Sequence, residues 1–115
     1  MAEVRAGVDA VDREIAALLG QRFGYMTAAA RIKTDRGAVR DEVRKAAVIA
    51  QAEAQAVAAG VPAGLAATLW ETLVEASIAY ELALWDGARA SEPAGARGAS
   101  DGARTRDLRR DRPAL

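Results

Sequence analysis

Three cations, Arg5, Arg22 and Lys33, lie on or beside the apolar stripe of a segment whose pattern predicts a long helix over residues 3–34. Arg22 continues an apolar series that ends at Leu19, at a position where a further apolar residue is expected. Lys33 follows eleven residues later, rotated from Arg22 by only ~20° and with its Cα atom ~16 Å away. Arg5 is rotated by roughly 80–100° from both, so one straight helix cannot aim all three cations at one point. An antiparallel partner helix could bring its own Arg5 into the gap, which favours a dimer.

Polar residues on two further expected helices complete a candidate site. Ser77 and Glu81 are four residues apart and therefore share one helix face, which is otherwise apolar. Arg40, Asp41 and Arg44 open the second helix, with the two arginines on one side of it. Singly, each residue is more typical of a solvated surface or a packing position. As a set, three cations and one acid directed into a helical core favour a pocket for a small dianion, because a buried charge without a partner is costly.

The composition excludes several kinds of chemistry. The chain has no Cys and no His, which excludes disulfides, thiol catalysis, the usual zinc sites and a nucleophile activated by histidine. Sixteen basic residues balance sixteen acidic ones, so no basic surplus indicates nucleic-acid binding. No apolar run approaches the ~20 residues that span a membrane, and the N-terminus lacks the form of a signal peptide. We therefore expect a soluble, cytoplasmic protein without a metal site, a nucleic-acid partner or a membrane partner.

The hydrophobic periodicity predicts an all-α chain with one long and two medium helices. At 1.5 Å per residue the first helix is about 48 Å long, which exceeds the diameter of a domain this small. A second copy of the chain is therefore expected to cover part of it. The break after this helix includes Gly37, which can adopt a positive φ. A second helix is expected over residues 39–59, and a third begins at Pro62 and stops at Gly87.

The chain is expected to divide into a helical domain over residues 1–87 and a tail over residues 88–115. The tail is rich in Arg, Ala and Gly, and Leu108 and Leu115 are its only large apolar residues. Such a segment cannot bury enough apolar surface to offset the entropy lost on ordering, so we expect it to be disordered.

The first helix resembles that of a known enzyme family. The matching segments are residues 4–15 (VRAGVDAVDREI), 18–22 (LLGQR) and 29–33 (AARIK). They are similar to the first helix of the all-helical chorismate mutases and of the related isochorismate-pyruvate lyases. The resemblance covers about residues 3–86 and leaves the tail unexplained.

This resemblance implies an intertwined homodimer in which each site uses the first helix of both chains. It implies that Arg5 of one chain and Arg22 of the other bind the two carboxylates of chorismate. Lys33 would reach the ether oxygen and a carboxylate, and Glu81 would also donate to the ether oxygen. Further positions match substrate contacts in the family: Ser77, Arg44 and, near the ring hydroxyl, Asp41.

The chemistry implied by the resemblance suits the residues available. The rearrangement of chorismate to prephenate is pericyclic and needs no nucleophile, metal or cofactor. It needs a compact substrate conformer and donors aimed at the ether oxygen as the C–O bond breaks. Glu81 can donate only when protonated, so activity is expected to fall as rising pH removes that proton.

Two departures from the family pattern leave alternatives open. The stretch from Lys33 to Arg44 is one residue shorter than in typical mutases and closer to the lyase branch, although the proline frequent in that branch is missing. Lys45 stands where many mutases carry an acid, which affects recognition of the ring C4 substituent. The alternatives are an isochorismate-pyruvate lyase that forms salicylate and a 4-amino-4-deoxychorismate mutase. A third, from a different class, is a non-catalytic helical dimer that regulates a partner enzyme.

Overall fold

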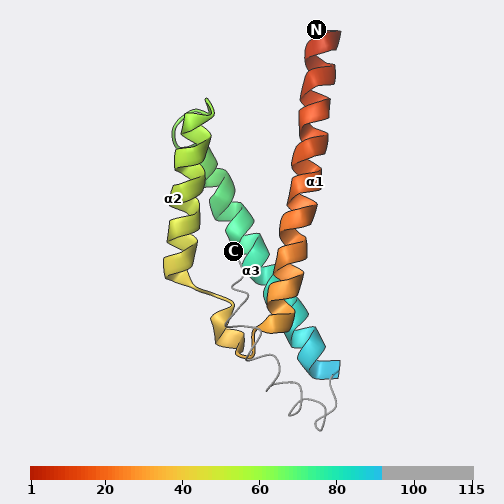
Figure 1. Cartoon of the computed structure of the whole chain (residues 1–115), viewed down its shortest axis with the longest axis vertical. Coiled ribbons are helices and arrows are strands. Elements are labelled where there is room, and N and C mark those ends of the chain that lie inside the picture. Colours follow the sequence, from red (N-terminus) through yellow and green to blue (C-terminus); the bar gives the residue numbers. More distant parts are fainter. Residues whose placement is uncertain (92–115) are drawn as a thin grey trace.

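Three α-helices make up most of residues 1–91, the part of the chain that the computed structural model describes (Figure 1). Helix α1 spans Ala2–Ile32, α2 spans Glu42–Ala58 and α3 spans Leu65–Ser91. A short 3-10 turn, η1 (Arg36–Ala38), lies between α1 and α2. The described residues contain no strand, so the predicted all-α fold with three helices is confirmed. None of these helices is both long enough and apolar enough to cross a membrane.

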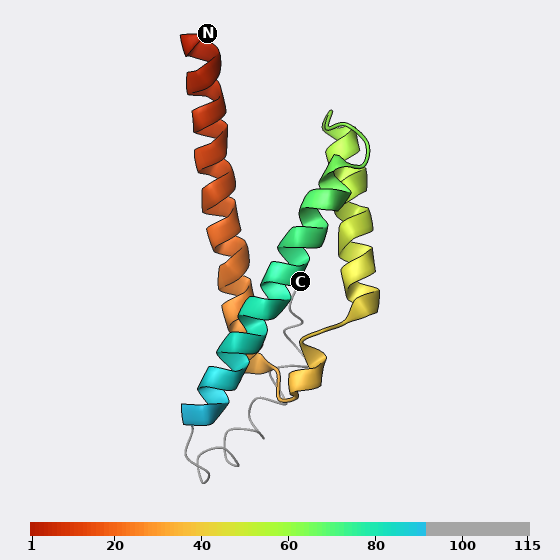
Figure 2. The ribbon, with the colours of Figure 1, turned by 180° about the vertical axis from the view of Figure 1, so that it is seen from behind.

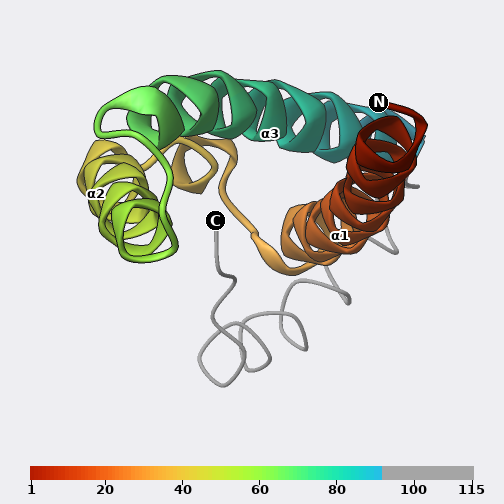
Figure 3. The same cartoon turned by 90° about the horizontal axis from the view of Figure 1, so that it is seen from above.

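Helix α3 is the central element, because both α1 and α2 pack against it. Helices α2 and α3 form an antiparallel hairpin, whereas α1 and α3 run in the same direction and converge toward their C-terminal ends (Figure 2). Seen from above, α2 lies toward one end of α3 and α1 toward the other (Figure 3). The N-terminal half of α1 therefore extends away from the other two helices.

Glycines with a positive φ angle lie in the connection between α2 and α3, whereas Gly37, in the connection between α1 and α2, has no positive φ. The Gly37 N–H donates to the carboxylate of Asp35, the residue that caps turn η1, and Gly37 does not adopt the positive φ that the sequence suggested. Gly60 and Gly64 have φ angles of 97° and 89°, a region that residues with a Cβ atom disfavour. Gly60 follows the end of α2 as expected, whereas Gly64 delays α3, which begins at Leu65 and not at Pro62.

Helix α3 continues past Gly87 to Ser91, so the predicted end at Gly87 is wrong. A glycine inside a helix costs only about 1 kcal/mol relative to alanine. Beyond it, Arg89 donates a hydrogen bond to the Lys33 carbonyl at the end of α1, a contact that the continued helix makes possible. Disorder was predicted for residues 88–115, but residues 88–91 form the end of α3; residues 92–115 lie outside the described residues.

The apolar core cluster lies between α2, α3 and the segment that leads into α2. Its buried members are Val39, Val48, Val74 and Ile78, with Ile49, Trp70 and Leu82 packed against them. Where α1 approaches α3, the buried residues of α1 are Met26, Ala29 and Ala30. Alanines at this position allow the helix backbones to approach closely, which brings the polar side chains of α1 within reach of α3.

The N-terminal half of α1 carries an apolar stripe that the single chain leaves in water. Its side chains are exposed by between 37% (Leu19) and 60% (Leu18). The stripe consists of Val4, Val8, Val11, Ile15, Leu18 and Leu19. Helical stability in proteins comes mostly from packing of an apolar face. The dimer predicted from the length of α1 stays a prediction. The exposed apolar stripe supports it, because a second copy of the chain could cover these residues.

The core assignment predicts a contrast between two valines. Val74 is fully buried and Val43 is 82% exposed. We expect Val74→Ala to lower the free energy of unfolding by about 2 kcal/mol, through lost apolar burial and the cavity left behind. Val43→Ala should change it by less than about 0.5 kcal/mol. Urea denaturation followed by circular dichroism measures both, and equal effects would contradict the assignment.

Candidate active site

The site begins with a hydrogen bond between α1 and α3. Arg22 Nη1 donates to Ser77 Oγ at 2.7 Å, and Ser77 is completely buried. The Ser77 hydroxyl itself donates to the Leu73 carbonyl at 2.7 Å, one turn earlier on α3. Because its proton is used in that bond, the Ser77 oxygen is free to accept from the arginine. The serine therefore holds the Arg22 guanidinium against α3.

A buried ion pair joins the end of α1 to the next turn of α3. Lys33 Nζ lies 2.7 Å from Glu81 Oε2, and the two side chains are only 8% and 2% exposed. Ser77 and Glu81 are one helical turn apart on the same face. Arg22 and Lys33, which lie eleven residues apart on the sequence, are therefore brought to adjacent points on α3.

A second arginine lies close to Arg22 and has the same charge. Burial, and secondarily the positive charge of Arg44, lower the pKa of the Arg22 guanidinium below its ordinary value. Arg22 Nη2 and Arg44 Nε are buried and have no hydrogen-bond partner among the described residues. Buried donors are almost always paired in folded proteins. Two such donors on neighbouring cations indicate a site for an anion, since carboxylates bind guanidinium groups strongly.

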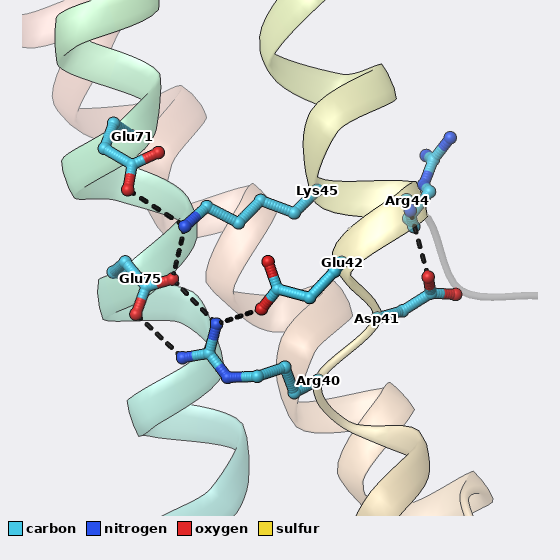
Figure 4. Close-up of polar contacts among 7 residues, drawn as sticks. All are labelled: Arg40, Asp41, Glu42, Arg44, Lys45, Glu71 and Glu75. Atoms are coloured by element: carbon cyan, nitrogen blue, oxygen red, sulfur yellow. Dashed lines mark hydrogen bonds and ion pairs between the residues drawn. The ribbon is translucent and has the colours of Figure 1, made fainter.

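The start of α2 positions Arg44. Asp41 caps this helix, its carboxylate accepting a hydrogen bond from the Arg44 N–H at 3.0 Å (Figure 4). A network of ion pairs fixes the same turn to α3: Glu75 accepts from Arg40 at 2.8 Å and from Lys45 at 2.7 Å. The Arg44 guanidinium points away from Glu75 and from this network (Figure 4). Arg40 and Lys45 thus hold the first turn of α2 against α3. The Arg44 guanidinium takes no part in these ion pairs.

Hydrogen bonds within this network shift the acid–base properties of its members. Those from Arg40 and Lys45 lower the pKa of the Glu75 carboxyl to about 2. Bonds to Glu75 and Glu71 raise the pKa of the Lys45 ammonium. Lys45 is therefore held by two carboxylates of α3.

Arg5 is not brought to the other predicted site residues within one chain, and Asp41 contacts them only through the backbone N–H of Arg44. Arg5 is exposed on the part of α1 that extends away from α2 and α3. Asp41 is exposed as well, and its carboxylate is used in capping α2. The remaining five predicted residues gather on or near one face of α3: Arg22, Lys33, Arg44, Ser77 and Glu81.

Sequence analysis missed two residues that contact this site. Trp85 Nε1 and Arg89 Nη2 both donate to the Lys33 carbonyl, at 3.0 Å and 2.6 Å. The available signal was their spacing of four and eight residues from Glu81, which puts all three on one helix face. Arg89 had been assigned to the tail because of its composition. Among the described residues, no cluster of acidic side chains is suited to hold a metal ion.

Comparison with known protein families gives a match over most of the helical part of the chain. A family described as chorismate mutase type II matches residues 4–82, which is most of the described chain. The chain therefore belongs to the all-helical chorismate mutase family. No curated protein and no solved structure gave a match.

The depressed pKa of Glu75 predicts a pH dependence of stability. Its folded-state value of about 2 lies below its ordinary value of 4.5, so its contribution is complete above pH ~4.5 and is lost as the pH falls toward 2. We expect Glu75→Gln to destabilise the protein at pH 7 and to differ less from wild type at pH 3. Urea midpoints at both pH values measure this. Glu14→Gln, on the exposed surface of α1, is the control, and a Glu75→Gln effect independent of pH would contradict the assignment.

Proposed function

We propose that this protein is a chorismate mutase that converts chorismate to prephenate without a cofactor, acting in the cytoplasm as an intertwined homodimer. Membership in the family supports the class of reaction. The observation that carries the proposal is the pair of buried, unpartnered donors on Arg22 and Arg44. Chorismate has two carboxylates, and a dianion would supply the acceptors that these guanidinium groups lack.

The dimer supplies the cation that is missing from the single chain. The apolar stripe of α1 needs a cover, and Arg5 lies on the same exposed half of this helix. If a second copy packs on the stripe in antiparallel fashion, Arg5 of the partner subunit joins Arg22 and Lys33. Each site then holds one substrate carboxylate on Arg22 and the other on the partner's Arg5.

The proposed catalytic groups are Lys33 and Glu81. As the ether C–O bond breaks, negative charge develops on its oxygen, and a fixed ammonium group stabilises it. The Lys33 carbonyl is already held by Trp85 and Arg89, so the backbone at Lys33 needs little reorganisation. In the structure Glu81 accepts from Lys33. Its expected role as a protonated donor to the ether oxygen therefore requires this pair to rearrange when substrate binds.

The remaining proposed contacts orient the substrate. Arg44 would bind a carboxylate next to Arg22, and the Ser77 hydroxyl would keep the Arg22 guanidinium in position. The Asp41 cap orients the first turn of α2, and the carboxylate itself would lie near the ring hydroxyl. Holding the compact conformer in this way lowers the entropy cost of reaching the transition state.

A second candidate reaction is the formation of salicylate and pyruvate from isochorismate. The observation that favours it is the position of Lys45, which is held by Glu71 and Glu75 of α3 and itself offers no acceptor to a C4 substituent. The 4-amino-4-deoxychorismate mutase reaction also requires a distinct C4 contact. Incubation with each of the three substrates, followed by identification of products, decides between them. Absence of product from all three would contradict the enzyme proposal and favour a regulatory helical dimer.

Mixing inactive variants tests the shared site. We expect Arg5→Ala and Arg22→Ala each to abolish turnover and to remain folded dimers. When the two are mixed and allowed to exchange subunits, half of the dimers are mixed, and each of these has one site with both arginines. Activity should then recover to about a quarter of the wild-type value, by the symmetry of a two-fold dimer.

The matched control uses two residues that the structure brings together within one chain. Arg22→Ala mixed with Lys33→Ala leaves every site defective, because Ser77 and Glu81 of one α3 hold both side chains. No activity should return. Recovery in this mixture, or full activity of any of the single variants, would contradict the proposed site.

A further inference from the structure

Three residues on one face of α3 contact Lys33, one at its side-chain ammonium group and two at its backbone carbonyl. Glu81, Trp85 and Arg89 follow one another at intervals of four residues and so lie on one helix face. Glu81 accepts a hydrogen bond from the Lys33 ammonium at 2.7 Å. Trp85 Nε1 and Arg89 Nη2 donate to the Lys33 carbonyl oxygen at 3.0 Å and 2.6 Å.

The backbone of Lys33 needs such contacts because it is where α1 ends. Its φ and ψ angles of −66° and 131° are extended, so the chain has left the helix at this residue. The last carbonyls of a helix have no donor within the helix, and a cation near them is favourable. Arg89 supplies both a donor and a charge. Its guanidinium also lies 4.6 Å from the centre of the Trp85 ring, which keeps the two donors together.

We propose that Trp85 and Arg89 are positioning residues that act as a clamp on the Lys33 carbonyl and thereby fix the direction of the Lys33 side chain. The role of this direction in catalysis rests on the proposed function, whereas the clamp itself does not. With the carbonyl held, the Lys33 ammonium is limited to the region beside Glu81 where the substrate ether oxygen would lie. A displacement of about 1 Å of such a group can reduce a rate substantially.

Three variants separate the clamp from general effects on stability. Trp85→Phe removes the N–H donor and keeps an aromatic ring beneath Arg89. Arg89→Gln removes the cation, and Arg89→Lys restores the charge with a different donor geometry. Trp70→Phe is the matched control, because this tryptophan lies on the same helix and packs against the apolar core. Circular dichroism checks that each variant is folded.

The chain offers a direct readout of Lys33 that does not depend on activity. Lys33 and Lys45 are its only lysines, so reductive methylation followed by mass spectrometry reports each of them separately. Lys45 is held by Glu71 and Glu75, away from the clamp, and serves as the internal reference. Glu81→Gln, which weakens the other contact of Lys33, provides a positive control for increased methylation.

We expect Trp85→Phe and Arg89→Gln each to raise the Lys33/Lys45 methylation ratio by about 3- to 10-fold, the effect of losing one hydrogen bond. The value of kcat should fall by about the same factor, KM should change by less than about 2-fold, and Arg89→Lys should recover part of the loss. Trp70→Phe should leave the ratio unchanged.

Three results would overturn the inference: an unchanged ratio in both clamp variants, an equal change in Trp70→Phe, or a raised ratio with unchanged kcat. If the ratio rises and the wild-type protein turns over none of the three substrates, the clamp on Lys33 is supported and the proposed function is contradicted. The two failures are therefore distinguishable.

Discussion

Two guanidinium groups of like charge, those of Arg22 and Arg44, lie close together and are partly buried, and no described residue pairs a carboxylate with either guanidinium. Arg22 and Arg44 each leave a buried donor without a partner among the described residues, and the charge of Arg44 contributes to the lowered pKa of Arg22. Folding brings these groups together against their mutual repulsion and at a cost in lost hydration. An anion bound here would remove both penalties, and the proposed function assigns this place to a carboxylate of the substrate.

The rest of the structure holds the cations in this unfavourable arrangement. Helix α3 provides the receiving face, with Ser77 for Arg22 and Glu81 for Lys33. The start of α2 brings Arg44 from the other side and is fixed to α3 through Glu75. The cations thus come from two helices that contact the same third helix. A pericyclic reaction depends on such fixed placement, because no covalent step compensates for poor alignment.

Helical periodicity was sufficient to predict the three-helix fold and the helix faces on which several candidate residues lie, whereas their roles stay predictions. Arg22 occupies a position where an apolar residue was expected, and Ser77 and Glu81 share a face, so spacing alone marked them. Arg5 was also recognised as unable to join the others on one helix, and the structure leaves it exposed at a distance from them. Spacing could not show that Lys33 pairs with Glu81 or that Lys45 turns to Glu75, because the crossing of helices decides which faces meet. Arg89 was not predicted as a site residue because the composition of the C-terminal region indicated a disordered tail. Its contact with Lys33 depends on tertiary packing, which accompanies the continuation of α3 past Gly87.

The most direct test of the anion site follows the arginine side chains themselves. The Nε–H signals of Arg22 and Arg44 can be recorded by ¹H–¹⁵N NMR during titration with prephenate and assigned with Arg22→Lys and Arg44→Lys variants. Both signals should shift together and saturate, while that of Arg13, exposed on α1, stays in place. Signals of Arg22 and Arg44 that do not move at saturating prephenate would contradict the account.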